Sequence, residues 1–150
     1  MPRSFFSPYQ NPRLPDGPRG EHLPERLAGD SVEFIAANKN HPFLLYLSFY
    51  SVHTPLQGKA DLVAKYRKKA ARLPAPGEHP EFGPEEQVWQ PGGTKAPPRK
   101  VRIRQRHAVY AAMMESMDTA VGRVLDALDQ HKLTRNTIVI FMSDNGGLST

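Results

Sequence analysis

The sequence predicts an α/β fold in which helices cover a mostly parallel sheet, with only part of that sheet inside the chain. Two short apolar runs, residues 42–50 and 136–144, have the length and composition of strands buried in a parallel sheet. Segments with helical periodicity separate them, and parallel strands need such crossover connections. Because two strands do not make a stable sheet, the prediction is a partial α/β sandwich whose remaining strands come from elsewhere.

The first forty residues divide into a loop and a helix. Residues 1–22 hold five prolines, at positions 2, 8, 12, 15 and 18, and predict an extended loop and not a packed element. A helix is expected over residues 24–38, where Pro24 suits a first turn. One face of that helix would carry the apolar side chains of Leu23, Leu27, Val32, Phe34 and Ile35.

The next segments alternate in character. PFLLYLSFY, residues 42–50, lies between Pro42 and Thr54-Pro55 and predicts a strand that is buried on both faces. KADLVAKYRKKAAR, residues 59–72, predicts a short basic amphipathic helix. Residues 73–100 contain seven prolines and predict a surface excursion, with Trp89 as its expected anchor to the body.

The last part predicts a long helix followed by a strand. From about residue 101 to Lys132, apolar residues recur at spacings of three and four, namely Tyr110, Met113, Met117, Val121, Val124 and Leu128. The methionines on this stripe favour core packing over a cofactor site. NTIVIFMSD, residues 136–144, has an apolar, partly β-branched centre at Ile138–Met142 and predicts the second buried strand.

Composition narrows the classes of function. The absence of cysteine excludes disulfides, thiolate metal sites and a cysteine nucleophile. A net charge of +5 fits either a basic surface or an anionic partner. No apolar run approaches the roughly 20 residues of a membrane-spanning helix. The first residues do not form a signal peptide. Either the protein is cytoplasmic or its natural N-terminus is missing, and the motifs favour the second alternative.

The first candidate site is the turn Asp144-Asn145-Gly146-Gly147, which directly follows an apolar strand. In open parallel sheets, ligands bind beyond the carboxyl ends of the strands. The carboxylate of Asp144 and the amide carbonyl of Asn145 are hard oxygen donors of the kind that bind calcium or magnesium. The alternative is a hairpin, because Asn-Gly after a strand is a strong hairpin signal.

The second candidate is His53, just past the other apolar run. If the two strands are parallel, His53 and Asp144 share one edge of the sheet. A histidine there can donate a hydrogen bond to an anion or transfer a proton. The third candidate is the basic run Arg99, Lys100, Arg102, Arg104 and Arg106, which either binds anions or is the solvated entrance to a helix.

Several of these segments together resemble the sulfatase family of the alkaline-phosphatase-like superfamily. PFLLYLSFYSVHTPLQ is similar to the strand-and-histidine segment of that family. YAAMMESMDTAVGRVLDAL followed by NTIVIFMSDNGG is similar to its long helix and metal-binding strand end, and FFSPYQNPRLPDGP to a lead-in of many bacterial members. The resemblance implies that residues 1–150 are part of one catalytic domain, a partial α/β/α sandwich.

The resemblance also implies a chemistry, the hydrolysis of sulfate esters by a formylglycine nucleophile beside a calcium ion. Asp144 and Asn145 match the later pair of metal ligands, and His53 matches the histidine that contacts the sulfate or the leaving-group oxygen. The cation and the hydrogen-bond donors would stabilise negative charge on the sulfuryl oxygens.

Other parts of the family pattern are absent. The early acidic pair and the C/S-x-P-x-R nucleophile motif are missing, since Lys95 stands in the reactive place of Lys95-Ala96-Pro97-Pro98-Arg99. The Lys-x-His pair after the nucleophile is also missing, and Lys39-Asn40-His41 lies at the wrong edge of the expected sheet. We therefore expect a chain with half of a calcium shell and no formylglycine, which is inactive alone.

Two alternatives remain at this point. One is a phosphatase or phosphodiesterase of the same superfamily, and the other is a non-catalytic anion-binding module that uses the run from Arg99 to Arg106. For the full-length protein, the resemblance implies a sulfated small molecule or glycan as substrate, no nucleic acid, and a periplasmic or extracellular location. The sequence of this chain does not itself fix the compartment.

Overall fold

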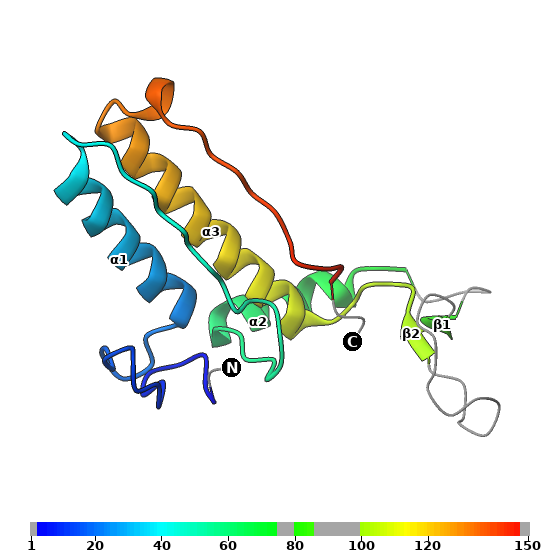
Figure 1. The fold of residues 1–150 in the computed structure, drawn as a ribbon. Coiled ribbons are helices and arrows are strands. Elements are labelled where there is room, and N and C mark those ends of the chain that lie inside the picture. Colours follow the sequence, from blue (N-terminus) through cyan, green and yellow to red (C-terminus); the bar gives the residue numbers. More distant parts are fainter. Residues whose placement is uncertain (1–2, 75–79, 86–99, 148–150) are drawn as a thin grey trace, which may run out of the picture.

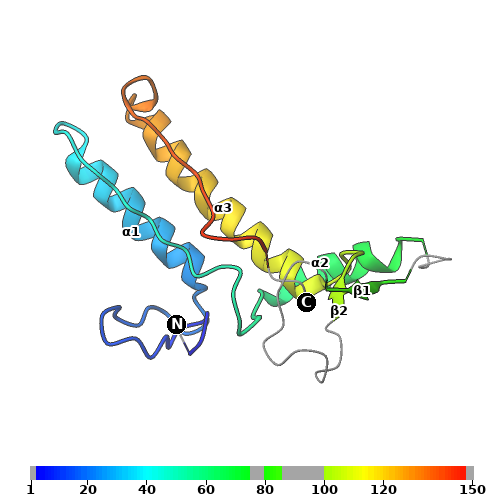
Figure 2. The same cartoon turned by 45° about the vertical axis from the view of Figure 1, so that its right-hand side comes forward.

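The fold consists of three helices with extended segments laid along them. A computed structural model describes residues 3–74, 80–85 and 100–147. In chain order, the elements are α1 Leu23–Asn38, α2 Ala60–Ala71, β1 Phe82–Pro84, β2 Lys100–Arg102, α3 Ala108–Gln130 and the 3-10 turn η2 Thr134–Asn136. Helices α1 and α3 pack side by side, and α2 packs against the N-terminal part of α3 (Figures 1 and 2).

The three predicted helices are confirmed, with α3 beginning later and ending slightly earlier than expected. Pro24 occupies the first turn of α1, where its missing N–H costs no helical hydrogen bond. At the start of α3, His107 Nδ1 accepts a hydrogen bond from the Tyr110 N–H at 3.1 Å and so caps the helix. Among the described residues, no helix is both long enough and apolar enough to cross a membrane.

Small side chains occupy much of the buried face of α3. Ala112, Ser116, Ala120 and Ala127 are all buried there, together with the larger Tyr110, Met113 and Leu128. Small residues let helix backbones approach closely, and α1 contributes the buried Ala28 and Ser31 to the same layer. The predicted stripe is therefore only partly correct, because Met117 and Val121 face a shallow hollow that Phe141 also borders.

The segment 42–50 is extended but does not form a hydrogen-bonded strand, and it runs along α1 and α3 (Figure 1). Phe43 and Leu45 pack against a cluster that contains Ile35 and Leu128. The intervening Leu44 and Tyr46 are each 88% exposed. The prediction of a strand buried on both faces is therefore wrong for this chain. One face packs on the helices, and the other has no covering layer among the described residues.

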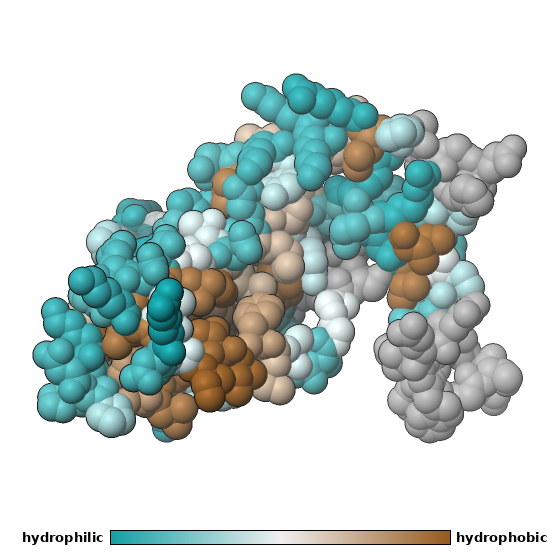
Figure 3. Space-filling view, turned by 90° about the horizontal axis from the view of Figure 1, so that it is seen from above, coloured by the Kyte–Doolittle hydropathy of each residue, from teal (hydrophilic) through white to brown (hydrophobic). Residues whose placement is uncertain are grey.

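The segment 137–143 likewise stays unpaired and runs along α3 (Figure 1). All five residues from Ile138 to Met142 are exposed, Ile138 by 90% and Phe141 by 70%. The predicted second buried strand is thus not formed within the described residues, because it has no neighbour to accept its backbone hydrogen bonds. A space-filling view shows apolar side chains gathered over one side of the body, which is typical of a surface that another element covers (Figure 3).

The proline-rich region 73–100 contains β1 and leads into β2, and the two strands form a short antiparallel pair in which Gly83 lies opposite Val101. This pair extends away from the helices (Figure 1). The Arg102 guanidinium lies over the Phe82 ring at 4.5 Å and forms an ion pair with Glu81. Trp89, the expected anchor, lies outside the described residues.

The lead-in before α1 is a loop, as predicted, but the expectation that it is not packed is wrong. Phe5 and Tyr9 are completely buried, and Phe5 joins a core with Leu23 and Met113. The Tyr9 hydroxyl donates a hydrogen bond to the Glu21 carboxylate at 2.9 Å. Prolines therefore exclude regular structure here without excluding burial.

This packing predicts very different effects for two phenylalanine truncations. Phe5→Ala should lower the free energy of unfolding by about 3–5 kcal/mol, because it leaves a cavity in the core. Phe141→Ala removes the same atoms from a largely exposed position and should cost well under 1 kcal/mol. Urea denaturation followed by far-UV circular dichroism measures both. Equal losses for the two variants would contradict the described core.

Candidate functional site

The loop from Ser51 to Gly58 carries His53 and rests on the core at the N-terminal end of α3. Val52 and Leu56 pack against the cluster that contains Met113. Gly58 lies so close to α3 that a Cβ atom there would be 2.9 Å from the Cβ of Ala112. A larger residue at position 58 would push the loop away from the helix, so the glycine is needed for this approach.

Gln57 fixes the end of this loop by contacts with three separate segments. Its side-chain Oε1 accepts a hydrogen bond from the Phe5 N–H at 2.7 Å. Its backbone N–H donates to the Met113 sulfur at 3.2 Å, and its carbonyl oxygen lies 3.1 Å from His22 Nε2. Because a carbonyl only accepts, His22 carries its proton on Nε2 in this contact. The lead-in, α1 and α3 thereby all hold the loop that presents His53.

The His53 side chain is exposed, and its contacts are local. Nδ1 lies 3.1 Å from both the hydroxyl and the carbonyl oxygen of Thr54. Nε2 has no hydrogen-bond partner among the described residues. One ring nitrogen is thus oriented by the neighbouring residue, and the other is available to a ligand.

Asp144 and Asn145 lie in an exposed bend after the extended segment 137–143. The Ser143 hydroxyl donates to the Asn145 carbonyl oxygen at 2.5 Å and holds the bend. Gly147 then reaches α3, because a Cβ atom at this position would be 2.8 Å from the Tyr110 hydroxyl oxygen. No group of three or more potential metal-ligating side chains occurs within the described ranges.

The two candidate segments therefore both reach the first turns of α3. The His53 loop contacts Val109 and Met113, and the Asp144 turn ends against Tyr110. The alternative of a hairpin after Asn145 would need a return strand beyond Gly147, where the described residues end. In the basic run, Arg106 has a structural role, because its guanidinium donates hydrogen bonds to the carbonyl oxygens of Ala70 and Leu73. Arg99 lies outside the described residues.

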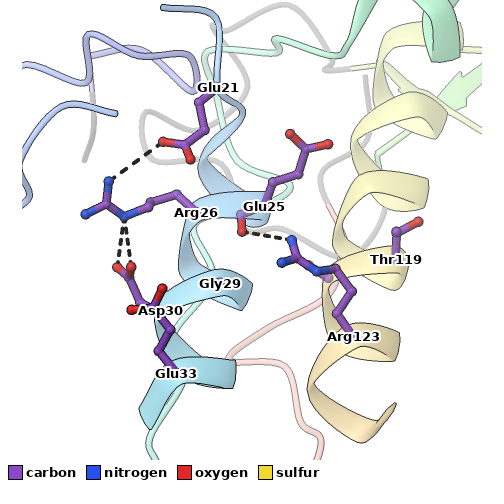
Figure 4. Close-up of a pocket in the computed structure, with 9 residues that line it drawn as sticks. Glu21, Glu25, Arg26, Gly29, Asp30, Glu33, Thr119 and Arg123 are labelled. Carbon is purple, nitrogen blue, oxygen red and sulfur yellow. Dashed lines mark hydrogen bonds and ion pairs between the residues drawn. The ribbon is translucent and has the colours of Figure 1, made fainter. Parts of the chain in front are cut away.

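A hollow of about 470 Å³ between α1 and α3 is a separate feature (Figure 4). Most of the charged side chains that line it form ion pairs or hydrogen bonds with other residues of the same hollow. Arg26 donates to Asp30 at 2.9 Å and lies 3.8 Å from a Glu21 oxygen. Arg123 donates to the Glu25 carbonyl oxygen at 3.2 Å. None of the predicted site residues lines it, so its size alone does not make it the candidate site.

Three supporting residues were not predicted from the sequence, namely His22, Gln57 and Tyr110. His22 is completely buried, and its ring stacks on Phe6 with centroids 4.8 Å apart. Its position directly before Leu23-Pro24 was the available signal, since a residue before a helix start is held by the first turn. Gln57 acts through contacts with residues more than 50 positions away, and Tyr110 meets Gly147 from a different segment. Local sequence patterns do not reveal such contacts.

Comparison with known proteins gives a consistent result. The sequence profile of the Sulfatase family matches residues 3–149. The chain is 31% identical to human arylsulfatase H over 127 residues, which are 85% of this chain and 16% of that protein. It is also 31% identical to a sulfatase of Formosa agariphila over 147 residues, or 91% of this chain and 21% of that protein.

A solved structure supports the fold independently. The crystal structure of Ps i-CgsB in complex with k-i-k-neocarrahexaose aligns with a TM-score of 0.54 at 22% identity, over 85% of this chain and 22% of that one. The predicted fold class, a partial α/β sandwich of the alkaline-phosphatase-like type, is confirmed by this likeness. The chain spans less than a quarter of the length of any of these three relatives.

Because His22 is buried and contacts the loop at Gln57, we expect the stability of the fold to depend on pH. Burial is the main cause that lowers the pKa of its imidazole, and the hydrogen bond to Gln57 opposes this effect. Below about pH 6.5 the unfolded chain binds a proton that the folded chain does not, so stability falls as the pH falls. The contribution is at most about 1.4 kcal/mol per pH unit.

We expect His22→Gln to flatten the decline in the free energy of unfolding between about pH 6.5 and 5, measured by urea denaturation. His41→Gln, at an exposed position, is the matched control and should keep the wild-type slope. If His22→Gln also keeps that slope, another group causes the acid sensitivity.

Proposed function

Because the chain belongs to the sulfatase family, we propose that it forms part of a catalytic domain that hydrolyses sulfate esters, with residues 1–150 within that one domain. The observation that carries the proposal is the family match over residues 3–149, which includes His53, Asp144 and Asn145. The convergence of their two segments on the first turns of α3 supports a shared site.

In this proposal, His53 acts on the anionic end of the substrate. Thr54 orients Nδ1, and Nε2 donates a hydrogen bond to a sulfate oxygen or to the leaving-group oxygen. Exposure of the ring suits this role, because the substrate can approach without rearrangement of the core. The buried contacts of Gln57 hold the loop in place while His53 stays accessible.

Asp144 and Asn145 would bind calcium together with ligands from outside this chain. Calcium takes six to eight oxygen ligands, and the exposed carboxylate and amide oxygens of this bend are donors of that type. Two adjacent donors fit part of such a shell, and no third acidic or histidine ligand joins them among the described residues. When bound, the ion would stabilise negative charge on the sulfuryl oxygens.

The proposal assigns the nucleophile, a formylglycine, to residues other than these 150. No cysteine is present, and Lys95-Ala96-Pro97-Pro98-Arg99 lacks a residue that can be converted to formylglycine. The substrate would be a sulfated small molecule or glycan.

A chimera tests the assigned residues. Residues 3–149 replace the matching segment of an arylsulfatase that is active on an aryl sulfate, and the chimera is expressed with a formylglycine-generating enzyme. We expect turnover, with His53→Ala lowering kcat/KM by about 10²–10⁴-fold. Asp144→Ala and Asn145→Ala should weaken the rise in Tm that calcium produces.

His41→Ala provides the matched control, because this exposed histidine lies before the extended segment and should leave kcat/KM unchanged. Turnover that is insensitive to His53→Ala would contradict the catalytic assignment. A calcium-induced rise in Tm that survives Asp144→Ala and Asn145→Ala would contradict the metal assignment, even in a chimera that does not turn over.

The isolated chain gives a second test. We expect no aryl sulfate hydrolysis from residues 1–150, even with calcium and a formylglycine-generating enzyme, because the chain holds no nucleophile motif. A colorimetric aryl sulfate assay checks this, with a complete arylsulfatase as the positive control. Turnover by the isolated chain that is lost in His53→Ala would overturn the proposed incompleteness.

A further inference from the structure

The solvent-facing side of α2 carries a surplus of positive charge. Four cations lie within or directly after the last turns of the helix, and we call them the α2 basic patch; they are Arg67, Lys68, Lys69 and Arg72. All four are exposed. The only acidic residue of α2 is Asp61, at the other end of the helix. Cations near a helix C-terminus favour the helix dipole, but four exceed what that role requires.

Packing leaves this patch open to a ligand. Val63 is the buried residue of α2, and Lys65 is engaged by Glu115 of α3 at 2.7 Å. In contrast, none of the four patch residues forms an ion pair within the described ranges. At 3.6 residues per turn, Lys68, Lys69 and Arg72 project within an arc of about 100°. Arg67 lies about 100° to one side of that arc. The patch is therefore a cationic surface without ion-pair partners among the described residues.

Arg106 keeps the patch in place. Its guanidinium donates to the carbonyl oxygens of Ala70 at 2.9 Å and of Leu73 at 3.2 Å, which belong to the end of α2. This contact ties the helix end to the segment before α3. The patch thus has a fixed position relative to α3, the helix that also supports the His53 loop.

The patch and the candidate site lie on consecutive segments. Gln57 and Gly58 end the His53 loop, and α2 starts at Ala60. Twelve helical residues at 1.5 Å each place the end of α2 roughly 18 Å from its start. A substrate with one sulfate group at His53 would not span that length, whereas a polymer with sulfate groups along its length would.

From this arrangement we propose that the α2 basic patch binds additional sulfate groups of a sulfated polysaccharide while one sulfate ester occupies the site at His53. This inference rests on the proposed function and narrows its substrate to a polyanionic glycan. Ammonium and guanidinium groups at an exposed surface attract the sulfate groups through charge, so the interaction weakens as salt increases. Duplex DNA is the competing polyanion, and it does not share the spacing or geometry of a sulfated glycan.

The test measures binding by the 150-residue chain. The probes are a sulfated galactan hexasaccharide, its desulfated form and duplex DNA of equal charge, compared by fluorescence anisotropy over a range of salt. The patch variant changes the four patch residues to Gln. A matched variant removes four exposed charges elsewhere, by Arg13→Gln, Arg19→Gln, Lys39→Gln and Arg135→Gln. Circular dichroism verifies that both variants fold.

We expect salt-dependent binding of the sulfated hexasaccharide, none of the desulfated form, and weaker binding of DNA. The patch variant should bind at least about tenfold more weakly, and the matched variant within about twofold of wild type. Equal losses in both variants, unchanged binding by the patch variant, or DNA binding as tight as that of the hexasaccharide would overturn the proposal.

A failure of the patch proposal and a failure of the proposed function give different results. Binding to the patch does not require turnover, so it is measurable even if the chimera is inactive. In an active chimera, the four patch substitutions should leave kcat/KM for a monosulfated aryl ester unchanged. They should lower kcat/KM for the sulfated oligosaccharide. A loss on both substrates would show that the patch acts on the site itself and would refute the proposal.

Discussion

Burial of Met113 on α3 is the interaction on which the other segments depend. Its side chain is completely buried beside Phe5 and Leu23, and its sulfur accepts the backbone N–H of Gln57 at 3.2 Å. The lead-in, the start of α1 and the His53 loop therefore meet at one side chain. A flexible, polarizable thioether suits such an irregular junction, where a branched side chain would leave gaps. Loss of this contact would release the loop as well as weaken the core.

Two ion pairs help to set the orientation of α2 relative to α1 and α3. Lys59, just before α2, contacts Glu25 of α1 at 2.5 Å, and Lys65 of α2 contacts Glu115 of α3 at 2.7 Å. Both pairs are substantially exposed, so each contributes little to stability. Their effect is geometric, because they fix how α2 leaves the His53 loop. The direction of α2 in turn decides where its basic surface lies.

The sequence was most informative where periodicity determines structure. The three helices follow from apolar spacing, since a helix satisfies its own backbone hydrogen bonds locally. Residues 42–50 and 137–143 show the opposite case: their composition favours strands, yet a strand requires a neighbour, and this chain supplies none among the described residues. Phe5 and Tyr9 show a third case, because prolines predict an irregular path but say nothing about burial. His53 and Asp144 could be chosen from their places after apolar runs, whereas Gln57 and Tyr110 depend on distant contacts.

The alternating exposure of residues 43–46 has a consequence for the substitutions that each position tolerates. Phe43 and Leu45 pack against a cluster of side chains of α1 and α3. Substitutions at these two positions must therefore preserve the volume of that cluster. Leu44 and Tyr46 point away from that cluster and are 88% exposed. Substitutions at Leu44 and Tyr46 are therefore not limited by the volume of that cluster. Adjacent positions of this short segment thus face different physical constraints: Phe43 and Leu45 must fit the helices, and Leu44 and Tyr46 need not.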